Sequence, residues 1–330
     1  MSASEAIRVG VVGVGVLGRH HTRLYKQSAG AELVGVYDVS PENAAAVAKE
    51  FDTKVFDTPE LLAAECEALS VAVPATKHHE VSMPLLEMGR HLLVEKPITA
   101  TVPEAQELVA LAEKKGLVLA VGHVERFNPA MDFLREHASD TRFVEAHRLA
   151  AYPPPRPGQH RRGTEVSVVL DLMIHDLDLV LTMVNSEVER IDAVGIPVLS
   201  KSEDIASVRL KFKNGSVANL TASRVSNEPM RKFRVFLKDT YISMDYANHA
   251  GIILKKTKLG LAKKDVNLNE KNALQDELDD FVRCVQETKQ SGVVSQPKVS
   301  GLQGLAALSL AVRITEGIEE YNKQYGFSFS

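Results

Sequence analysis

Three glycines and one aspartate near the N-terminus have the spacing of a dinucleotide-binding turn. The glycines form a GxGxxG directly after the apolar run Ile7–Val12, and they are Gly13, Gly15 and Gly18. In such a turn the first glycine permits a tight bend, the second admits a pyrophosphate, and the third lets the next helix approach the strand. Asp38 follows twenty residues after the last glycine, at the end of a second apolar run. A carboxylate there suits the adenosine ribose hydroxyls and repels a 2′-phosphate, so the pattern favours NAD over NADP.

Lys96, Asp171 and His175 have the side chains for proton transfer at a hydroxyl group. Asp171 and His175 lie four residues apart in a helical pattern, so both project from one face. An imidazole titrates near neutrality and can take a hydroxyl proton, and the carboxylate can orient it or bind a neighbouring hydroxyl. Lys96 ends a strand, where its ammonium can stabilise a developing alkoxide. The alternative is structural: a core histidine paired with Asp171, and a surface lysine.

The first part of the chain alternates strand and helix patterns, as in a doubly wound parallel sheet. The sites of such sheets lie at the carboxyl ends of their strands, so residues that follow the strands are candidates for cofactor contact. After the first strand, Val16 and Leu17 offer amides to the pyrophosphate at a helix N-terminus. The candidates after the fourth, fifth and sixth strands are Val73, Pro74, Ala75, Thr76, His78, Glu95, Lys96 and His123. For His123 a plain structural role is the alternative.

Beyond Thr141 the pattern changes to the alternation of antiparallel strands with one exposed face. Helical patterns cover 166–184, 272–289 and 301–322, and the basic stretch Lys255–Lys264 suggests a solvated loop. We therefore predict an α/β protein with a Rossmann domain at 1–124 and an α+β domain at 125–330, built on a large, open, mainly antiparallel sheet. Self-association would cover the open face of that sheet.

Composition excludes several classes of function. The chain has 330 residues, 45% of them hydrophobic and 25% charged, with a net charge of −4. That charge gives no reason to expect a nucleic acid or an anionic membrane as a partner, and no apolar run has the length of a membrane span. Cys66 and Cys284 lie far apart without metal or redox spacing, which favours free thiols in a reducing cytoplasm. The histidines show no metal spacing, so no metal is expected.

Four motifs in this order resemble the glucose–fructose oxidoreductase / inositol dehydrogenase / MocA (Gfo/Idh/MocA) family. They are the GxGxxG with Asp38, Glu95-Lys96-Pro97, Arg126-Phe127-Asn128-Pro129, and Asp171-x-x-x-His175. The resemblance covers essentially the whole chain. It implies NAD(P)-linked oxidation or reduction of sugars and cyclitols, catalysis by Lys96, Asp171 and His175, and a cis peptide before Pro97. It also implies a homodimer or homotetramer built through the open sheet.

Within the family, the motifs are most similar to the nucleotide-sugar branch, which includes UDP-N-acetylglucosamine 3-dehydrogenases of lipopolysaccharide and related pathways. The commoner pattern has glycines near Asp171 where this chain has Ser167–Leu170 and Met173, which disfavours simple monosaccharides. A UDP-sugar needs cations for its diphosphate, and a proline-rich loop carries several. The proposed substrate residues besides the catalytic three are Glu125, Arg126, Tyr152, Arg156, His160, Arg161 and Arg162. A solvated loop is the alternative for the basic cluster.

The expected activity is therefore NAD-dependent oxidation of a secondary hydroxyl, with C3 of UDP-N-acetylglucosamine as the specific prediction. An inositol or simple hexose dehydrogenase is the second enzymatic interpretation. A non-catalytic NAD-binding regulator is the alternative from another class, since proteins on one fold need not share an activity.

Overall fold

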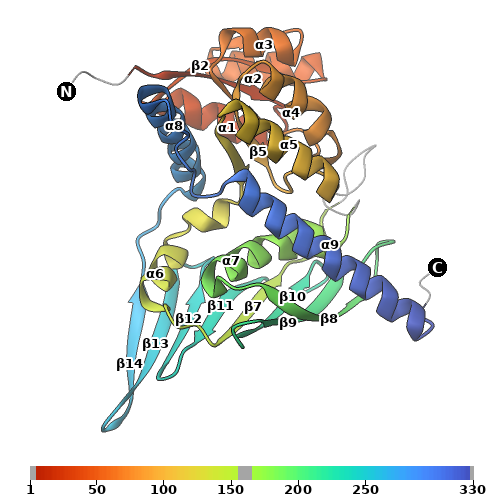
Figure 1. The fold of residues 1–330 in the computed structure, drawn as a ribbon, viewed down its shortest axis with the longest axis vertical. Helices are drawn as coiled ribbons and strands as arrows, with labels where there is room; N and C mark the ends of the chain where they lie inside the picture. The colour runs from red at the N-terminus through yellow and green to blue at the C-terminus, as the bar shows by residue number, and fades with distance from the viewer. Residues whose placement is uncertain (1–4, 155–165, 328–330) are drawn as a thin grey trace. The chain divides into compact units, whose positions relative to one another are not determined.

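The computed structural model describes residues 5–154 and 166–327. The chain divides into two compact units (Figure 1). Unit 1 contains 1–127 and 272–308, and unit 2 contains 128–271 and 309–330. The predicted division at 124/125 therefore differs from the structure in two respects. The first division lies at 127/128. The segment 272–308 returns to the first unit.

Unit 1 is built on a parallel sheet that has, in its described residues, the strand order β3-β2-β1-β4-β5-β6. The strands are β1 (Ile7–Val12), β2 (Ala31–Tyr37), β3 (Lys54–Val55), β4 (Ala68–Val71), β5 (His91–Glu95) and β6 (Leu119–Gly122). The order reverses between β1 and β4, and ligands of doubly wound sheets bind outside the carboxyl ends of the strands at such a switch point. The predicted Rossmann domain is thus present.

Several helices of unit 1 begin at residues whose side chains cap them. They are α1 (Val16–Gln27), α2 (Pro41–Phe51), α3 (Pro59–Glu65), α4 (His78–Glu87), α5 (Val102–Lys115) and α8 (Ala273–Ser291). Ser40 and Thr58 each accept a hydrogen bond from the first turn of α2 and α3, and each is followed by a proline at the first helical position. Thr101 and Glu104 form a capping box at α5, which ends at Gly116 in the left-handed conformation.

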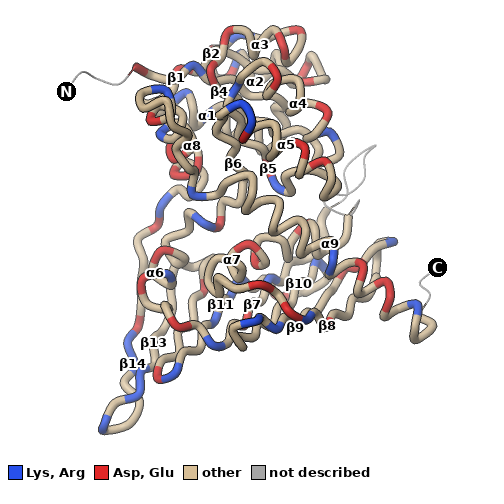
Figure 2. The backbone as a smooth tube through the Cα atoms, viewed as in Figure 1, with Lys and Arg blue, Asp and Glu red and all other residues tan. Residues whose placement is uncertain are grey.

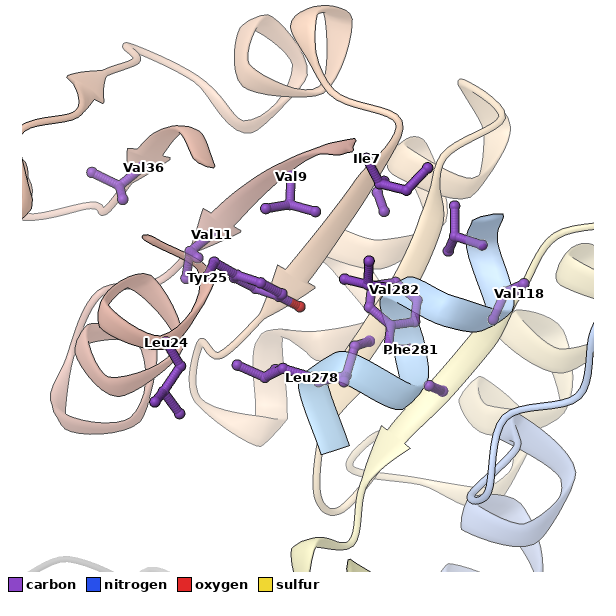
Figure 3. Close-up of a cluster of buried hydrophobic side chains, with 14 of the residues drawn as sticks. Ile7, Val9, Val11, Leu24, Tyr25, Val36, Val118, Leu278, Phe281 and Val282 are labelled. Atoms are coloured by element: carbon purple, nitrogen blue, oxygen red, sulfur yellow. The ribbon is translucent and has the colours of Figure 1, made fainter. Parts of the chain in front are cut away.

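Helix α8 belongs to unit 1 because its apolar face completes the core of the parallel sheet. Figure 3 shows Leu278, Phe281 and Val282 of α8 gathered with side chains of β1 and α1. The fully buried Tyr25 lies in the same cluster, where its hydroxyl hydrogen-bonds the Ser70 hydroxyl at 2.8 Å. Local patterning predicted this helix, but a contact made from so far along the chain is not visible in local periodicity.

Unit 2 carries a large sheet whose described strands follow the order β14-β13-β12-β11-β7-β10-β9-β8. The strands are β7 (Phe143–Leu149), β8 (Val188–Ile196), β9 (Ile205–Phe212), β10 (Val217–Ser223), β11 (Met230–Phe236), β12 (Thr240–Asp245), β13 (Ala250–Thr257) and β14 (Gly260–Asn267). Only the β7–β10 pair is parallel among these neighbours. The prediction of a mainly antiparallel sheet is confirmed. Strands β9 and β10 form a hairpin that turns at Asn214–Gly215, where Gly215 has φ +84°.

Alternate residues of this sheet form a buried face on which helices pack. Helix α6 (Pro129–His137) contacts β12, and α7 (Ile174–Val184) contacts β7. The turn before α7, Val169–Met173, is a π-helix that contacts β10. The last helix, α9 (Gly301–Gln324), contains the division between the two units. The buried faces of β7 and β10 therefore support the segment that carries Asp171 and His175.

The predicted loop at Lys255–Lys264 is wrong, because β13 and β14 form an antiparallel hairpin there. Strand β14 is at the edge of the sheet, and all but one of its residues are exposed. Figure 2 shows basic residues along this edge. Charged side chains are common on edge strands because they discourage pairing with other chains. The strand was missed because a strand exposed on both faces lacks the alternation that marks a half-buried one.

Cys66 and Cys284 are both buried and free. Among the described helices, none combines the length and the apolar character that crossing a membrane requires.

Replacing Phe281 with alanine should destabilise the protein by about 3–5 kcal/mol, because the ring is 1% exposed within the core of unit 1. Urea denaturation followed by circular dichroism measures the change in the free energy of unfolding. The control is Leu302→Ala at a side chain that is 55% exposed, with an expected change within about 0.5 kcal/mol. Equal effects of the two substitutions would contradict the placement of α8.

Candidate functional site

The glycine turn after β1 has the close packing that a dinucleotide-binding turn requires. Gly13 has φ +85°, a conformation that residues with a Cβ rarely adopt. A Cβ on Gly18 would lie 1.8 Å from the Gly13 carbonyl oxygen, so only glycine lets α1 come this close to the turn. A Cβ on Gly15 would meet nothing within 4 Å, which leaves this backbone accessible to a ligand. The three glycines therefore differ in their surroundings: Gly13 needs its unusual φ, Gly18 needs the close packing, and Gly15 is open.

The N-terminus of α1 fits a pyrophosphate. Gly15 is its N-cap, and no side chain among the described residues caps the first turn. The turn also carries no acidic residue, so its partial positive charge is not neutralised. The amides of Val16 and Leu17 belong to this turn, and helix amides in this position satisfy an anion well.

Asp38 is held beside the same turn. Its Oδ2 accepts a hydrogen bond from the Val14 amide at 2.8 Å, and its Oδ1 accepts one from the Ser40 amide at 2.9 Å. A carboxylate oxygen has a second lone pair, so both oxygens keep acceptor capacity for ribose hydroxyls. The two amides fix the orientation of the charge that would oppose a 2′-phosphate.

His78 connects the segments that follow β4 and β5. Its Nδ1 lies 2.8 Å from the Pro97 carbonyl oxygen and its Nε2 lies 2.9 Å from that of Val73. Burial lowers the pKa of this imidazole, although the backbone carbonyls oppose that effect. The Lys96–Pro97 peptide is cis, as the family resemblance implies. The His78 ring therefore lies between the backbone carbonyls of the two segments. The short turn Ala75–Lys77 separates Val73 from α4.

Glu95 is a buried carboxylate at the end of β5. Its Oε1 lies 3.1 Å from Nε2 of His21 on α1, and its Oε2 accepts the Lys96 amide at 3.2 Å. Burial raises the pKa of Glu95, but the contact with His21 and the charge of Lys96 outweigh it, so the carboxyl stays ionised. Gly122 leaves room for it, since a Cβ there would lie 2.8 Å from Oε2.

The sequence interpretation missed His21. The available signal was its position: three residues after Gly18 and four before Tyr25, on the face of α1 that packs against the sheet. The contacts of His21 and Gly122 with Glu95 show that α1, β5 and β6 meet around the Glu95 carboxylate.

The other unit 1 candidates also follow strand ends. Lys96 is half-buried beside Glu95, and the buried His123 follows β6, where its carbonyl accepts the Arg126 amide at 3.0 Å. Glu125 and Arg126 lie in the short 3-10 helix Val124–Phe127 and are both buried. The predicted cofactor residues of this unit therefore gather around the carboxyl ends of the strands, as the topology requires.

Asp171 and His175 lie in unit 2, at the start of the α7 segment. Asp171 is inside the π-helical turn and His175 follows the first residue of α7. Both side chains are half-buried, whereas Met173, Ile174 and Asp176 are buried. The pair thus lies on the accessible side of the segment, and π-helical turns of this kind often occur at functional sites.

A buried ion pair next to His175 fixes how α7 is rotated about its axis. Asp176 accepts hydrogen bonds from Arg148 on β7 at 3.0 and 3.3 Å and from the Tyr246 hydroxyl at 2.8 Å. The guanidinium also lies 5.4 Å from the centre of the Tyr246 ring. With Asp176 directed toward the sheet, its neighbour His175 projects about 100° away around the helix axis and is half-buried. Sequence analysis did not identify Arg148, since nothing local pairs it with Asp176.

Tyr152 also lies in unit 2, where its hydroxyl is 3.2 Å from the Ser200 hydroxyl. The remaining predicted substrate residues, Arg156, His160, Arg161 and Arg162, lie outside the described residues.

Comparison with known proteins agrees with this architecture. Residues 7–123 match the oxidoreductase family with an NAD-binding Rossmann fold, GFO_IDH_MocA, and residues 138–243 match the GFO/IDH/MocA C-terminal domain. The chain belongs to this family. It is thus an enzyme of an NAD-binding oxidoreductase family, as the four motifs imply.

Individual relatives place the chain more closely. It is 35% identical to a UDP-N-acetylglucosamine 3-dehydrogenase from Acidithiobacillus ferrooxidans over 96% of this chain and 98% of that protein. A solved structure of that dehydrogenase superposes with a TM-score of 0.88 and covers 96% of this chain and 99% of its own. A levoglucosan dehydrogenase in complex with NADH and levoglucosan, 18% identical, shares the fold with a TM-score of 0.84 over 96% of this chain and 98% of its own.

Replacing Asp38 with alanine should weaken NAD binding roughly tenfold or more, since hydrogen bonds to a charged group contribute about 1.5–3 kcal/mol. Isothermal titration with NAD and with NADP measures both affinities. Asp38→Asn keeps an acceptor for a backbone amide but removes the charge, so its main effect should be tighter NADP binding. The exposed Asp57 provides the control, Asp57→Ala. Unchanged preference for NAD in both Asp38 variants would contradict the assignment.

Proposed function

We propose that this protein is an NAD-dependent dehydrogenase that oxidises UDP-N-acetylglucosamine at C3. The observation that carries the proposal is the 35% identity, over 96% of the chain, to a dehydrogenase with that substrate. The residue types needed for the chemistry, Lys96, Asp171 and His175, all stand in the matching family motifs.

Each of these residues has a distinct part in the proposed reaction. A nicotinamide cofactor held by unit 1 would supply the hydride acceptor for the oxidised sugar carbon. His175 accepts the proton of the hydroxyl group, since an imidazole is a side chain that can act as a general base near neutral pH. Asp171 orients that imidazole or holds a neighbouring hydroxyl. The Lys96 ammonium donates to the reacting oxygen and stabilises its developing negative charge.

NAD rather than NADP is proposed as the cofactor. The support is Asp38, whose carboxylate is fixed by the Val14 and Ser40 amides beside the glycine turn. Its charge opposes a 2′-phosphate. Glu95 is proposed to contact the nicotinamide ribose, and His78 to maintain the spacing of the segments that follow β4 and β5.

The substrate diphosphate is proposed to bind the cations of the proline-rich segment, Arg156, His160, Arg161 and Arg162, together with Tyr152. This part of the proposal depends on the sequence, because guanidinium groups are suited to phosphate oxygens.

A homodimer or homotetramer through the open face of the unit 2 sheet is also proposed. That face carries the neighbouring rings of Phe143, Phe236 and Tyr241, whose centres lie 5.0 and 4.8 Å apart in successive pairs. The Glu145–Arg234 ion pair lies on the same face at 2.6 Å. Aromatic and arginine side chains are enriched in protein interfaces. The proposed setting is a lipopolysaccharide-related sugar pathway in the cytoplasm, which agrees with two free cysteines.

A second candidate is an inositol dehydrogenase. It is favoured by 32% identity to the myo-inositol dehydrogenase Hyg17 from Streptomyces leeuwenhoekii, although over only 57% of this chain and 58% of that protein.

Incubation with NAD and a panel of UDP-sugars, hexoses and inositols separates these functions. The proposal predicts NADH formation, followed at 340 nm, with UDP-N-acetylglucosamine as the preferred substrate. Turnover of inositols or free hexoses alone would replace it with the second candidate. Tight NAD binding without turnover of any compound would instead indicate a regulator.

Lys96→Ala and His175→Ala should each lower turnover by roughly 10²–10⁴-fold while leaving NAD affinity nearly unchanged. Steady-state kinetics and a parallel NAD titration give the two quantities. Lys115→Ala, at an exposed helix end in unit 1, is the control and should retain full turnover. Near-wild-type turnover in either variant would show that its catalytic role is misassigned.

A further inference from the structure

A buried ion pair in unit 2 lies outside the proposed catalytic residues. Arg224, just after β10, is 1% exposed, and Asp204, just before β9, is 0% exposed. Arg224 Nε donates to Asp204 Oδ1 at 2.7 Å, and the Arg224 amide donates to the Asp204 carbonyl at 2.9 Å. Taking two charges out of water costs free energy that a pair of apolar side chains would not, so stability alone does not explain the pair.

Asp204 organises the short segment that precedes it. Its Oδ2 accepts hydrogen bonds from the amides of Val198, Leu199 and Ser200 at 2.8, 2.5 and 2.8 Å. Burial raises the pKa of this carboxyl, but hydrogen bonds from the Ser200 hydroxyl, the Leu199 amide and Arg224 hold it well below its usual range. The carboxylate therefore stays charged and keeps the segment folded around it.

Arg224 uses its remaining donors on the backbone that leads into the Asp171/His175 helix. Its Nη1 donates to the Val166 carbonyl at 2.8 Å, which also accepts the Ser202 hydroxyl at 3.1 Å. Its Nη2 lies 3.2 Å from the Ser202 hydroxyl oxygen. Two residues later, the Val168 amide donates to the Glu203 carbonyl at 3.0 Å. The start of this segment is thus held at two backbone positions.

The distance in sequence from these anchors to the proposed catalytic residues is short. The Asp171 amide donates to the Ser167 carbonyl at 3.0 Å. The backbone that Arg224 and Glu203 contact therefore leads directly into the helical turn that carries Asp171. The same cluster reaches Tyr152, whose hydroxyl lies 3.2 Å from that of Ser200, itself bonded to Arg224 Nη2 at 3.2 Å.

We propose that Arg224 is a positioning residue, which with Asp204 and Ser202 holds the Val166–Val168 backbone so that Asp171 and His175 stand correctly for proton transfer. The planar guanidinium is suited to this work because it presents several donors at fixed angles, which a lysine does not. This inference rests on the proposed function.

Arg224→Lys keeps the buried positive charge but removes the several donors that the planar guanidinium presents at fixed angles. Ser202→Ala removes only one donor to the Val166 carbonyl. A displacement of about 1 Å at a reacting group can lower the rate roughly 10²-fold. We expect Arg224→Lys to lower kcat about 30-fold and Ser202→Ala about fivefold, with KM changed less than about threefold, because the lost geometry matters in the transition state. Rates are expressed per folded molecule, from a thermal melt.

The matched control is Arg190→Lys. Arg190 pairs with Asp192 at 2.8 Å in the same unit, but this pair is exposed and should contribute little. Hydrogen exchange supplies a readout independent of activity. The amides of 168 and 171 should exchange at least tenfold faster in Arg224→Lys, while those of β9 stay within about twofold of the wild type.

Unchanged kcat with unchanged exchange at 168 and 171 would overturn the proposal. Faster exchange throughout the sheet, with kcat lost only in proportion to the unfolded fraction, would overturn it as well, since that pattern marks a purely structural pair. If the wild type turns over no UDP-sugar, the proposed function fails, and the exchange measurement alone decides whether Arg224 holds this backbone.

Discussion

The contact between Gly18 and the carbonyl of Gly13 is the constraint on which the cofactor half of the molecule depends. Because no Cβ fits between them, α1 can lie against the turn that follows β1, with its uncapped first turn open to a ligand. The same helix carries His21, whose Nε2 lies 3.1 Å from Glu95 Oε1, so the position of α1 also affects the carboxylate at the end of β5. Glu95 in turn accepts the Lys96 amide, which links the helix to the proposed catalytic lysine.

In unit 2 the catalytic candidates lie on one helical segment, so their orientation depends on the contacts that this segment makes with the sheet and with its neighbouring loops. Asp176 binds Arg148 and Tyr246 on the sheet side, and Arg224 with Asp204 holds the backbone that precedes the π-helical turn. Both devices use arginine buried with aspartate, which contributes less to stability than to fixed geometry. Hydride transfer needs such geometry, since its rate depends on the placement of few atoms.

Local sequence signals were sufficient for much of this. GxGxxG with Asp38 and the alternation of strand and helix patterns predicted the parallel sheet and its helices. The alternation beyond Thr141 predicted most strands of the second sheet. Signals that depend on distant partners were not visible. The exposed edge strand β14 lacks alternation, α8 returns to unit 1, and the pairs His21–Glu95, Arg148–Asp176 and Arg224–Asp204 join residues far apart in the chain. The motifs therefore support a proposal for the reacting residues, but they contain no signal for the contacts that hold those residues.

The measurement that tests the central claim most directly follows the hydride itself. The protein is incubated with NAD and UDP-N-acetylglucosamine that carries deuterium at C3, and the reduced cofactor is examined by mass spectrometry. Oxidation at C3 predicts that the NADH formed is one mass unit heavier than NADH from the unlabelled sugar. Unlabelled NADH from the deuterated sugar would place the oxidation at another carbon and would contradict the assignment.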